Sequence, residues 1–127
     1  YIEKEVIPFG EKNGIGQVVF SPLAQGLLTG KYKSAQDIPS DSRAGKLENV
    51  RKSITPEKIE KVNQLSAIAA ELGITVSQLA LAWILRQPNV ASALVGASRP
   101  EQIEENAAAS GVQLTQEVID RIEAILG

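Results

Sequence analysis

Residues 95–106 decide how this chain is interpreted, because an apolar run stops there at a glycine and a helix opens directly after it. They read Val95-Gly96-Ala97-Ser98-Arg99-Pro100-Glu101-Gln102-Ile103-Glu104-Glu105-Asn106. Ser98 and Glu101 have the spacing of a capping box, and Pro100 falls in the first turn, where its missing N–H costs nothing. The pattern predicts a strand that ends at a helix N-terminus, with Arg99 beside it. Such an arrangement suits a phosphate group.

A second strand followed by a loop lies earlier in the chain. It reads Val18-Val19-Phe20-Ser21-Pro22-Leu23-Ala24-Gln25-Gly26-Leu27-Leu28-Thr29-Gly30-Lys31-Tyr32. The short unbroken run over residues 17–20 is typical of a strand that is buried on both faces of a parallel sheet. The glycines at 14 and 16 precede this strand instead of following it, so they predict a turn and not a dinucleotide-binding glycine loop.

The composition indicates a globular chain of at most one ordinary domain. Of the 127 residues, 43% are hydrophobic and 22% are charged, which excludes a disordered polymer. The net charge of −2 argues against nucleic-acid binding, which normally requires a basic excess. We find neither an apolar run near the roughly 20 residues needed to span a bilayer nor a secretory signal, so we expect no membrane partner. The lack of cysteine fits a cytoplasmic protein.

Two absences limit the chemistry that these residues can perform. The chain contains no histidine and no cysteine, which excludes an imidazole base, a thiolate nucleophile and a His/Cys metal site within it. The sequence opens at Tyr1, partway into a predicted helix, and this start indicates a truncated or processed piece. We expect the reactive groups of any enzyme to lie outside these residues.

Periodicity and capping residues predict five helices. They cover residues 1–13, 55–73, 75–87, 99–109 and the segment from Thr115 onward. The second has an apolar stripe made of Ile59, Val62, Leu65, Ile68, Ala69 and Leu72. In the third, Thr75 and Gln78 have capping-box spacing, and Trp83 lies on the apolar stripe, where a core role is expected. Residues 24–54 lack periodicity and predict a long functional or disordered loop with a local basic excess.

The predicted order is helix, strand, loop, helix, helix, strand, helix, helix, which is the pattern of β/α units. Two strands cannot close a sheet, and a buried parallel pair needs neighbours at its edges. The sequence therefore predicts part of a larger α/β architecture.

Taken together, the two motifs resemble the C-terminal portion of the aldo-keto reductases, and most closely the bacterial reductases that are similar to potassium-channel β-subunits. The matching residues are 20–24, 26–32, 80–85 and 96–106. The family folds as a (β/α)8 TIM barrel of about 250 residues or more. The resemblance implies that residues 1–127 are a partial barrel, one segment from its C-terminal half. Phe20 would end the seventh strand and Val95 the eighth, and the family binds NADP(H) in the loops that follow these strands.

The resemblance assigns a first group of cofactor contacts around the earlier loop. These are Phe20, Ser21, Pro22, Leu23, Gly26, Lys31 and Arg43. Phe20 would support the nicotinamide ring, Ser21 and Leu23 would contact the pyrophosphate, and Lys31 and Arg43 would pair with phosphates. The alternatives are an ordinary buried strand aromatic, a simple turn and solvated loop charges.

A second group of contacts lies around the later helix. These are Gly96, Ser98, Arg99, Gln102, Glu105 and Asn106. Ser98 and Arg99 would bind the adenosine 2′-phosphate, which favours NADPH over NADH. Gln102 and Asn106 share one helical face and would reach the adenine edge, with Glu105 nearby. The alternative is a capped helix with an exposed arginine, whose glutamates are ordinary charges at a helix start.

The resemblance also implies an activity, the reduction of aldehydes or ketones by hydride transfer from NADPH. In the family a tyrosine donates the proton, helped by a lysine, an aspartate and usually a histidine. None of the four can be assigned here, because histidine is absent and Tyr1 and Tyr32 occupy the wrong positions. We therefore predict no catalytic residue and no metal ligand in this chain.

Three interpretations remain open from the sequence. The chain is the cofactor-binding part of a reductase whose catalytic half lies elsewhere, or it is a non-catalytic nucleotide-binding or regulatory module. In the third interpretation it is a helical interaction piece whose open sheet edge pairs with another chain. The open edges of the sheet predict one of two alternative partners, either the missing N-terminal barrel half or a second copy of this chain.

Overall fold

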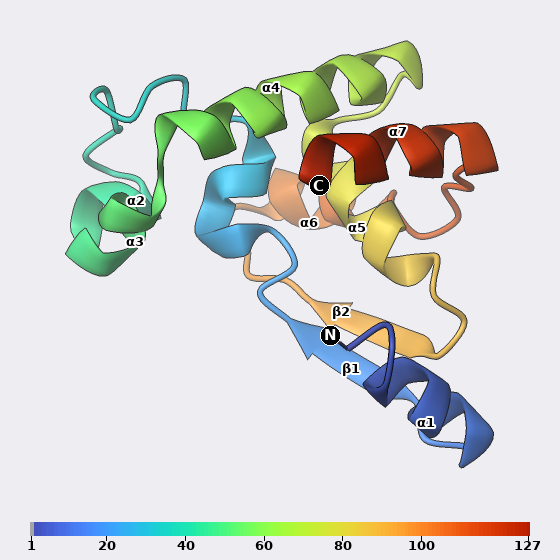
Figure 1. Cartoon of the computed structure of the whole chain (residues 1–127). Helices are drawn as coiled ribbons and strands as arrows, with labels where there is room; N and C mark the ends of the chain where they lie inside the picture. Colours follow the sequence, from blue (N-terminus) through green and yellow to red (C-terminus); the bar gives the residue numbers. More distant parts are fainter. Residues whose placement is uncertain (1) are drawn as a thin grey trace.

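The computed structural model describes residues 2–127 and places a short parallel sheet beneath a layer of helices (Figure 1). In chain order the elements are α1 (Val6–Lys12), β1 (Gln17–Phe20), the 3-10 helix η1 (Ala24–Thr29), α2 (Arg43–Lys46), α3 (Glu48–Ser53), α4 (Pro56–Glu71), α5 (Val76–Leu85), β2 (Val90–Leu94), α6 (Pro100–Ala107) and α7 (Gln116–Leu126). This arrangement confirms the predicted α/β class. Tyr1 lies outside the described residues.

The two strands pair in parallel, as the sequence predicts. Phe20 at the end of β1 lies opposite Leu94 at the end of β2. Because paired parallel strands run in the same direction, their C-terminal ends meet at one edge of the sheet. The loops that begin at Ser21 and Val95 therefore leave the sheet side by side.

The prediction that β1 is buried on both faces is wrong. Val18 and Phe20 are 61% and 82% exposed, and Leu94 on β2 is 59% exposed. Side chains alternate between the faces of a strand, and Val19 and Ala93 on the opposite face are half-buried. Figure 1 shows the helical layer on one side of the sheet. One face is thus open, because residues 2–127 supply no further element that covers it.

The main core lies where α4, α5 and α7 meet. Its buried members are Leu65, Ile68, Ala69, Val76, Leu79, Val118 and Ile122. Apolar residues three and four positions apart on each helix supply these side chains, and the half-buried Trp83 packs against them as predicted. The predicted stripe on α4 is correct except at Leu72, which is 41% exposed. Leu72 is the C-cap residue and lies past the end of the packed face.

Threonine caps begin three of the helices, as the sequence predicts. Thr55, Thr75 and Thr115 each accept a hydrogen bond from the backbone N–H three residues further on. At Thr75 the capping box with Gln78 is complete. Such a cap is worth about 1 kcal/mol, because it satisfies a backbone N–H that has no partner inside the helix.

Residues 24–54 are not the structureless loop that we predict from the sequence. They contain η1, α2 and α3, and they enclose a second, smaller core. Its buried members are Tyr32, Ala44, Val50, Ile54 and Ile59. The sequence does not reveal α2 and α3 because helices of four and six residues are too short to display an apolar period. Figure 1 shows both helices beyond one end of α4.

The helices α4 and α5 are joined by a sharp bend. Gly73 follows the C-cap of α4 with a φ of +69°, a left-handed conformation that glycine adopts without strain. The two helix axes are bent by 88° at this break. Within residues 2–127 no single helix is long and apolar enough to cross a membrane, and α4 and α5 reach that length and composition only as this bent pair.

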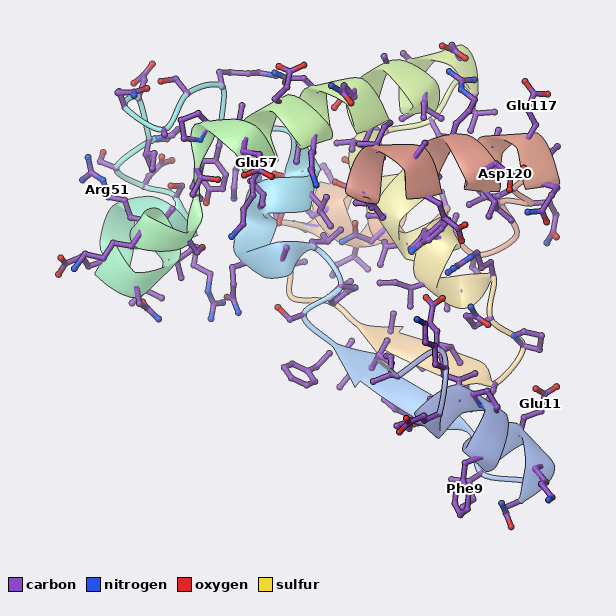
Figure 2. All side chains as sticks on the ribbon, viewed as in Figure 1. Phe9, Glu11, Arg51, Glu57, Glu117 and Asp120 are labelled. Carbon is purple, nitrogen blue, oxygen red and sulfur yellow. The ribbon has the colours of Figure 1, made fainter. Side chains whose placement is uncertain are left out.

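An exposed ion pair joins α4 to α7. Arg121 donates from Nη1 to Oε2 of Glu71 at 2.8 Å and from Nη2 to Oε1 at 3.0 Å. These hydrogen bonds hold the pKa of the Glu71 carboxyl below its usual 4.5. Figure 2 shows Glu117 and Asp120, two further carboxylates of α7, on the solvent side of this helix. Exposed pairs contribute little to stability, so the buried core carries most of the contact.

Glu71→Gln tests the ion pair through its pH dependence. Because the folded-state pKa of Glu71 is lowered, the pair stabilises the fold above pH 4.5 and loses this contribution as the pH falls through the lowered value. We expect a slightly lower thermal midpoint than the unsubstituted chain at pH 7 and no difference near pH 2.5, measured by circular dichroism. Glu60→Gln, on the same helix, is the control. A deficit of equal size at both pH values would contradict the assignment.

Leu79→Ala tests the main core. Leu79 is 2% exposed, so its truncation leaves a cavity and should lower the free energy of unfolding by about 2–5 kcal/mol. Urea denaturation measures the change. The control Leu72→Ala, at a site that is 41% exposed, should cost less than about 1 kcal/mol. Equal costs at the two leucines would show that the core lies elsewhere.

Candidate functional site

The end of β1 presents an exposed aromatic ring at the edge where both loops begin. Phe20 is the last residue of the strand and is 82% exposed. The alternative that it is an ordinary buried strand aromatic is therefore wrong for the chain as described. A ring that is free on its face can stack against a planar ligand.

The loop after β1 turns sharply through left-handed backbone. Ser21, Ala24 and Gln25 have φ values of 56°, 47° and 59°, and Gly26 has 95°. Few residues other than glycine adopt these angles, and clusters of them are found at ligand sites. The turn is held by its own hydrogen bonds: Ala24 N–H donates to Ser21 O at 3.1 Å, and the Gln25 amide donates to the Ser21 hydroxyl at 3.3 Å.

This turn is anchored on the helical layer. Pro22 is buried, and Leu28 packs against the main core. Both also line an apolar cavity of about 210 Å³ together with Leu79 and Trp83 of α5. Further along, a Cβ added at Gly30 would lie 3.2 Å from Val76 Cγ1, so the backbone here runs close to the start of α5. The predicted pyrophosphate contacts therefore stand on a packed support.

Lys31 and Arg43, the predicted phosphate partners, are both exposed. Within residues 2–127 neither has a carboxylate oxygen within 4 Å of its charged nitrogens. Arg43 is the first residue of α2, whose N-cap Ser42 accepts a hydrogen bond from Gly45 N–H at 3.1 Å. Both cations are thus free to meet an anion, and the alternative of solvated loop charges stays open.

The predicted capping box at residues 98–101 is wrong. Arg99 is the N-cap of α6 and makes no side-chain cap. Proline is favoured at the first helical position, and Pro100 takes that place, which puts Glu101 one residue too early to complete the box. Ser98 pairs with Gln102 instead. Gln102 Oε1 accepts from Ser98 N–H at 2.8 Å and from its hydroxyl at 3.2 Å.

The N-terminus of α6 opens at the same edge of the sheet as the turn after β1. Gly96, Ser98 and Arg99 are all exposed, and a Cβ built on Gly96 would meet no atom within 4 Å. The exposed side chain of Arg99 is therefore open to a ligand, whereas Pro100 has no N–H and the N–H of Gln102 already donates to Arg99 O at 3.2 Å. Helix N-termini attract anions through their free amides and the helix dipole.

Further along α6, Glu105 ties the helix to α5. Its Oε1 accepts a hydrogen bond from the Thr75 hydroxyl at 2.8 Å, and its backbone carbonyl accepts one from Gln78 Nε2 at 2.9 Å. Gln102 and Asn106 share a half-buried face of the helix, as predicted. The sequence shows the capping box at Thr75 but not its second role, because Glu105 lies 30 residues away in the chain.

Comparison with known proteins identifies the family. The family model described as "Aldo/keto reductase family" matches residues 1–127. This chain belongs to the aldo/keto reductase family. Members of this family use nicotinamide cofactors.

Among its aldo/keto reductase relatives is a probable voltage-gated potassium channel subunit beta from Oryza sativa subsp. japonica. It is 44% identical over 131 residues, which cover 98% of this chain and 39% of the relative. An NADH-specific methylglyoxal reductase from Escherichia coli (strain K12) is 40% identical over 114 residues, which cover 90% of this chain and 34% of the relative. The chain therefore spans about two fifths or less of the length of these relatives.

The solved structure of a glycerol dehydrogenase from Gluconobacter oxydans matches with a TM-score of 0.81 and 30% identity. The match covers 98% of this chain and 38% of that structure, which is an aldo/keto reductase TIM barrel. Both the predicted resemblance and the predicted partial barrel are thus confirmed.

Thr75→Val tests the link between α5 and α6. The substitution keeps the branched shape but removes the cap and the bond to Glu105, so we expect a loss of about 1–2 kcal/mol in unfolding free energy. We also expect faster amide hydrogen exchange in residues 101–107. Thr115→Val removes a cap alone and is the matched control. Identical effects of the two variants on α6 would contradict the link.

Proposed function

We propose that this chain forms the NADP(H) site of an aldo/keto reductase that reduces aldehydes or ketones. The observation that carries the proposal is the parallel pairing of Phe20 with Leu94, which brings both predicted cofactor loops to one edge of the sheet. Anion-binding sites in barrels of this class lie at the C-terminal ends of the strands, in the loops after the seventh and eighth. The strands β1 and β2 take these two places in the proposed barrel.

In the proposed complex the nicotinamide ring lies against Phe20. When bound, NADPH supplies the hydride that reduces the carbonyl carbon of the substrate. The exposed ring of Phe20 supports one face of the nicotinamide and limits its orientation. The proton donor comes from the part of the barrel outside this chain, because Tyr32 is 2% exposed and serves the second core. Tyr1 lies outside the described residues.

The pyrophosphate takes its place over the turn after β1. Ser21 offers its hydroxyl and Leu23 its backbone N–H, while Pro22 and Gly26 fix the course of the chain. Lys31 and Arg43, neither of which has a carboxylate partner within residues 2–127, supply the positive charge. Charge-assisted hydrogen bonds of this kind are about twice as strong as neutral ones.

The 2′-phosphate of NADP(H) binds at the N-terminus of α6. Arg99 offers a guanidinium fork, and the positive end of the helix dipole adds to it. The Ser98 hydroxyl donates to the phosphate only after its proton turns away from Gln102 Oε1, so the backbone N–H of Ser98 then carries the bond to Gln102. Gln102 engages Ser98 through Oε1, which leaves its Nε2 to donate to the adenine ring, with Asn106 one turn further. Glu105 uses Oε1 for Thr75 and keeps its second carboxylate oxygen for the adenine amino group. Gly96 keeps the approach to this site open.

The open face of the sheet supports a partner for the chain. Val18 and Phe20 on β1, and Leu94 opposite Phe20 on β2, are exposed apolar side chains on this face. The remaining strands of the barrel, which the longer relatives possess, would cover Val18 and Leu94, while the ring of Phe20 at the edge of the sheet stays open to the nicotinamide. A second copy of the chain is the competing occupant, and it would give association that depends on concentration.

A second candidate function is a nucleotide-binding module without catalysis. It is favoured by the 44% identity with a relative that is described as a potassium channel subunit. Both candidates use the same cofactor site and differ in whether turnover follows binding.

A chimera tests the proposed site. In it the part of this chain that matches the NADH-specific methylglyoxal reductase replaces the aligned segment of that protein, about 34% of its length, and the remaining part supplies the rest of a barrel. Because the chimera contains Arg99, it should bind NADPH more tightly than NADH. The parent reductase is described as NADH-specific, so this preference would be reversed. Nicotinamide fluorescence measures both dissociation constants, and reduction of methylglyoxal measures turnover. A chimera that keeps the parent's preference would contradict the proposal.

Arg99→Ala in the same chimera tests the 2′-phosphate contact. We expect NADPH binding to weaken about 10- to 100-fold, the loss of a charge-assisted contact, with little change for NADH. Arg51→Ala removes an arginine that projects from α3 at the outer end of the molecule (Figure 2) and is the matched control. Equal losses for the two cofactors would remove Arg99 from this role.

A further inference from the structure

The structure assigns Tyr32 as a positioning residue that holds Lys31 and Arg43 in place on the segment between β1 and α4, residues 21–55. The assignment rests on the proposed function, because it concerns the same two cations. It adds a residue that acts through others and does not itself touch the cofactor.

Tyr32 is the centre of the second core. It is 2% exposed and, with Leu79, is one of the largest fully buried side chains among the described residues. Ala44, Val50, Ile54 and Ile59 complete the cluster, which joins α2, α3 and the start of α4. Because these side chains surround the ring, it can move only if the second core opens.

The hydroxyl of Tyr32 completes the N-terminus of α2. The first N–H groups of a helix have no acceptor within the helix. Ser42 Oγ serves Gly45 N–H at 3.1 Å, and Tyr32 Oη accepts from Ala44 N–H at 3.3 Å. Ala44 is fully buried, so no water can replace Tyr32 as the acceptor. The two bonds fix the turn that starts at Arg43.

Close packing beneath α2 leaves the helix little freedom. A Cβ added at Gly45 would collide with the carbonyl oxygens of Pro39 and Ser40. The Ser42 hydroxyl also donates to Pro39 O at 2.6 Å. The helix therefore packs tightly against the backbone of residues 39–40. This contact also fixes the backbone of Arg43, the first residue of the helix.

The same tyrosine also contacts the turn that carries Lys31. Lys31 Nζ lies 5.4 Å from the centre of the Tyr32 ring, within the range of a cation–π interaction. A Cβ at Gly26 would lie 3.0 Å from Lys31 Cε and 3.5 Å from Tyr32 Oη. Gly26, with its φ of +95°, thus lets the lysine stem and the tyrosine hydroxyl approach the turn.

These contacts place Tyr32 between Lys31 and Arg43. Its ring faces the ammonium group of Lys31, and its hydroxyl holds the backbone next to Arg43. Neither cation is fixed by a carboxylate within the described residues, so the backbone that Tyr32 holds sets where both side chains start, and the ring itself restrains the ammonium group of Lys31. Two charges that are placed in advance bind an anion more tightly than two that must first be ordered.

Tyr32→Phe tests this role, because it keeps the buried ring and removes only the hydroxyl. We expect the dissociation constants of NADPH and NADH to rise together, by about five- to tenfold, since the pyrophosphate is common to both cofactors. They are measured for the isolated chain and for the chimera with methylglyoxal reductase. Ser53→Ala, which removes a 2.7 Å hydrogen bond to Val50 O in the same segment, is the matched control and should leave both constants unchanged.

A double-mutant cycle separates positioning from simple stabilisation. In an Arg43→Ala background, Tyr32→Phe should cost less affinity than it does alone, because the group that it positions is gone. Amide hydrogen exchange at Ala44 should accelerate in Tyr32→Phe even without cofactor. Additive losses, or a lower melting temperature with unchanged affinity, would overturn the assignment.

The two proposals fail in different ways. If neither the unsubstituted chain nor the chimera binds either cofactor, the proposed function is wrong, and the role of Tyr32 falls with it. If the unsubstituted protein binds and Tyr32→Phe binds equally well, only the role of Tyr32 is wrong.

Discussion

Parallel pairing between β1 and β2 is the constraint on which the candidate site depends. An antiparallel pair would send the loops after Phe20 and Leu94 to opposite edges of the sheet, and the two motifs would never meet. A parallel pair needs a long crossover, which residues 21–89 supply with the helices from η1 to α5. The buried core of α4, α5 and α7 therefore does more than stabilise the chain, because it holds this crossover in the form that aligns the strands.

The start of α5 is the second fixed point. Val76 packs against the backbone at Gly30, and the capping box of Thr75 and Gln78 extends to Glu105. One helix terminus thus supports the end of η1 and the middle of α6, which flank the proposed cofactor site on its two sides. Capping, usually a local matter, here sets the relative position of two segments that are distant in sequence.

The sequence predicts those features that local chemistry determines. The threonine caps, the helix end at Gly73, the apolar stripe of α4 apart from Leu72 and the parallel class of the strands follow from sequence rules, and the structure confirms them. Burial of the strands could not be predicted from 127 residues, because the cover over Val18 and Leu94 depends on strands that the described chain does not contain. The role of Tyr32 could not be predicted for a related reason. Its partner Ala44 lies 12 residues further on, in the helix α2, which is too short to show an apolar period. At Ser98 the local rules conflicted, and the preference of Pro100 for the first helical position prevailed over the capping box.

A crystal structure of the chimera with bound NADPH would test the central claim most directly. The account predicts the pyrophosphate between the turn at Ser21 and the N-terminus of α6, the nicotinamide ring against Phe20 and the 2′-phosphate on Arg99. It also predicts that the strands supplied by the relative cover Val18 and Leu94. A cofactor bound away from this edge of the sheet, or a 2′-phosphate held by residues outside this chain, would contradict the account.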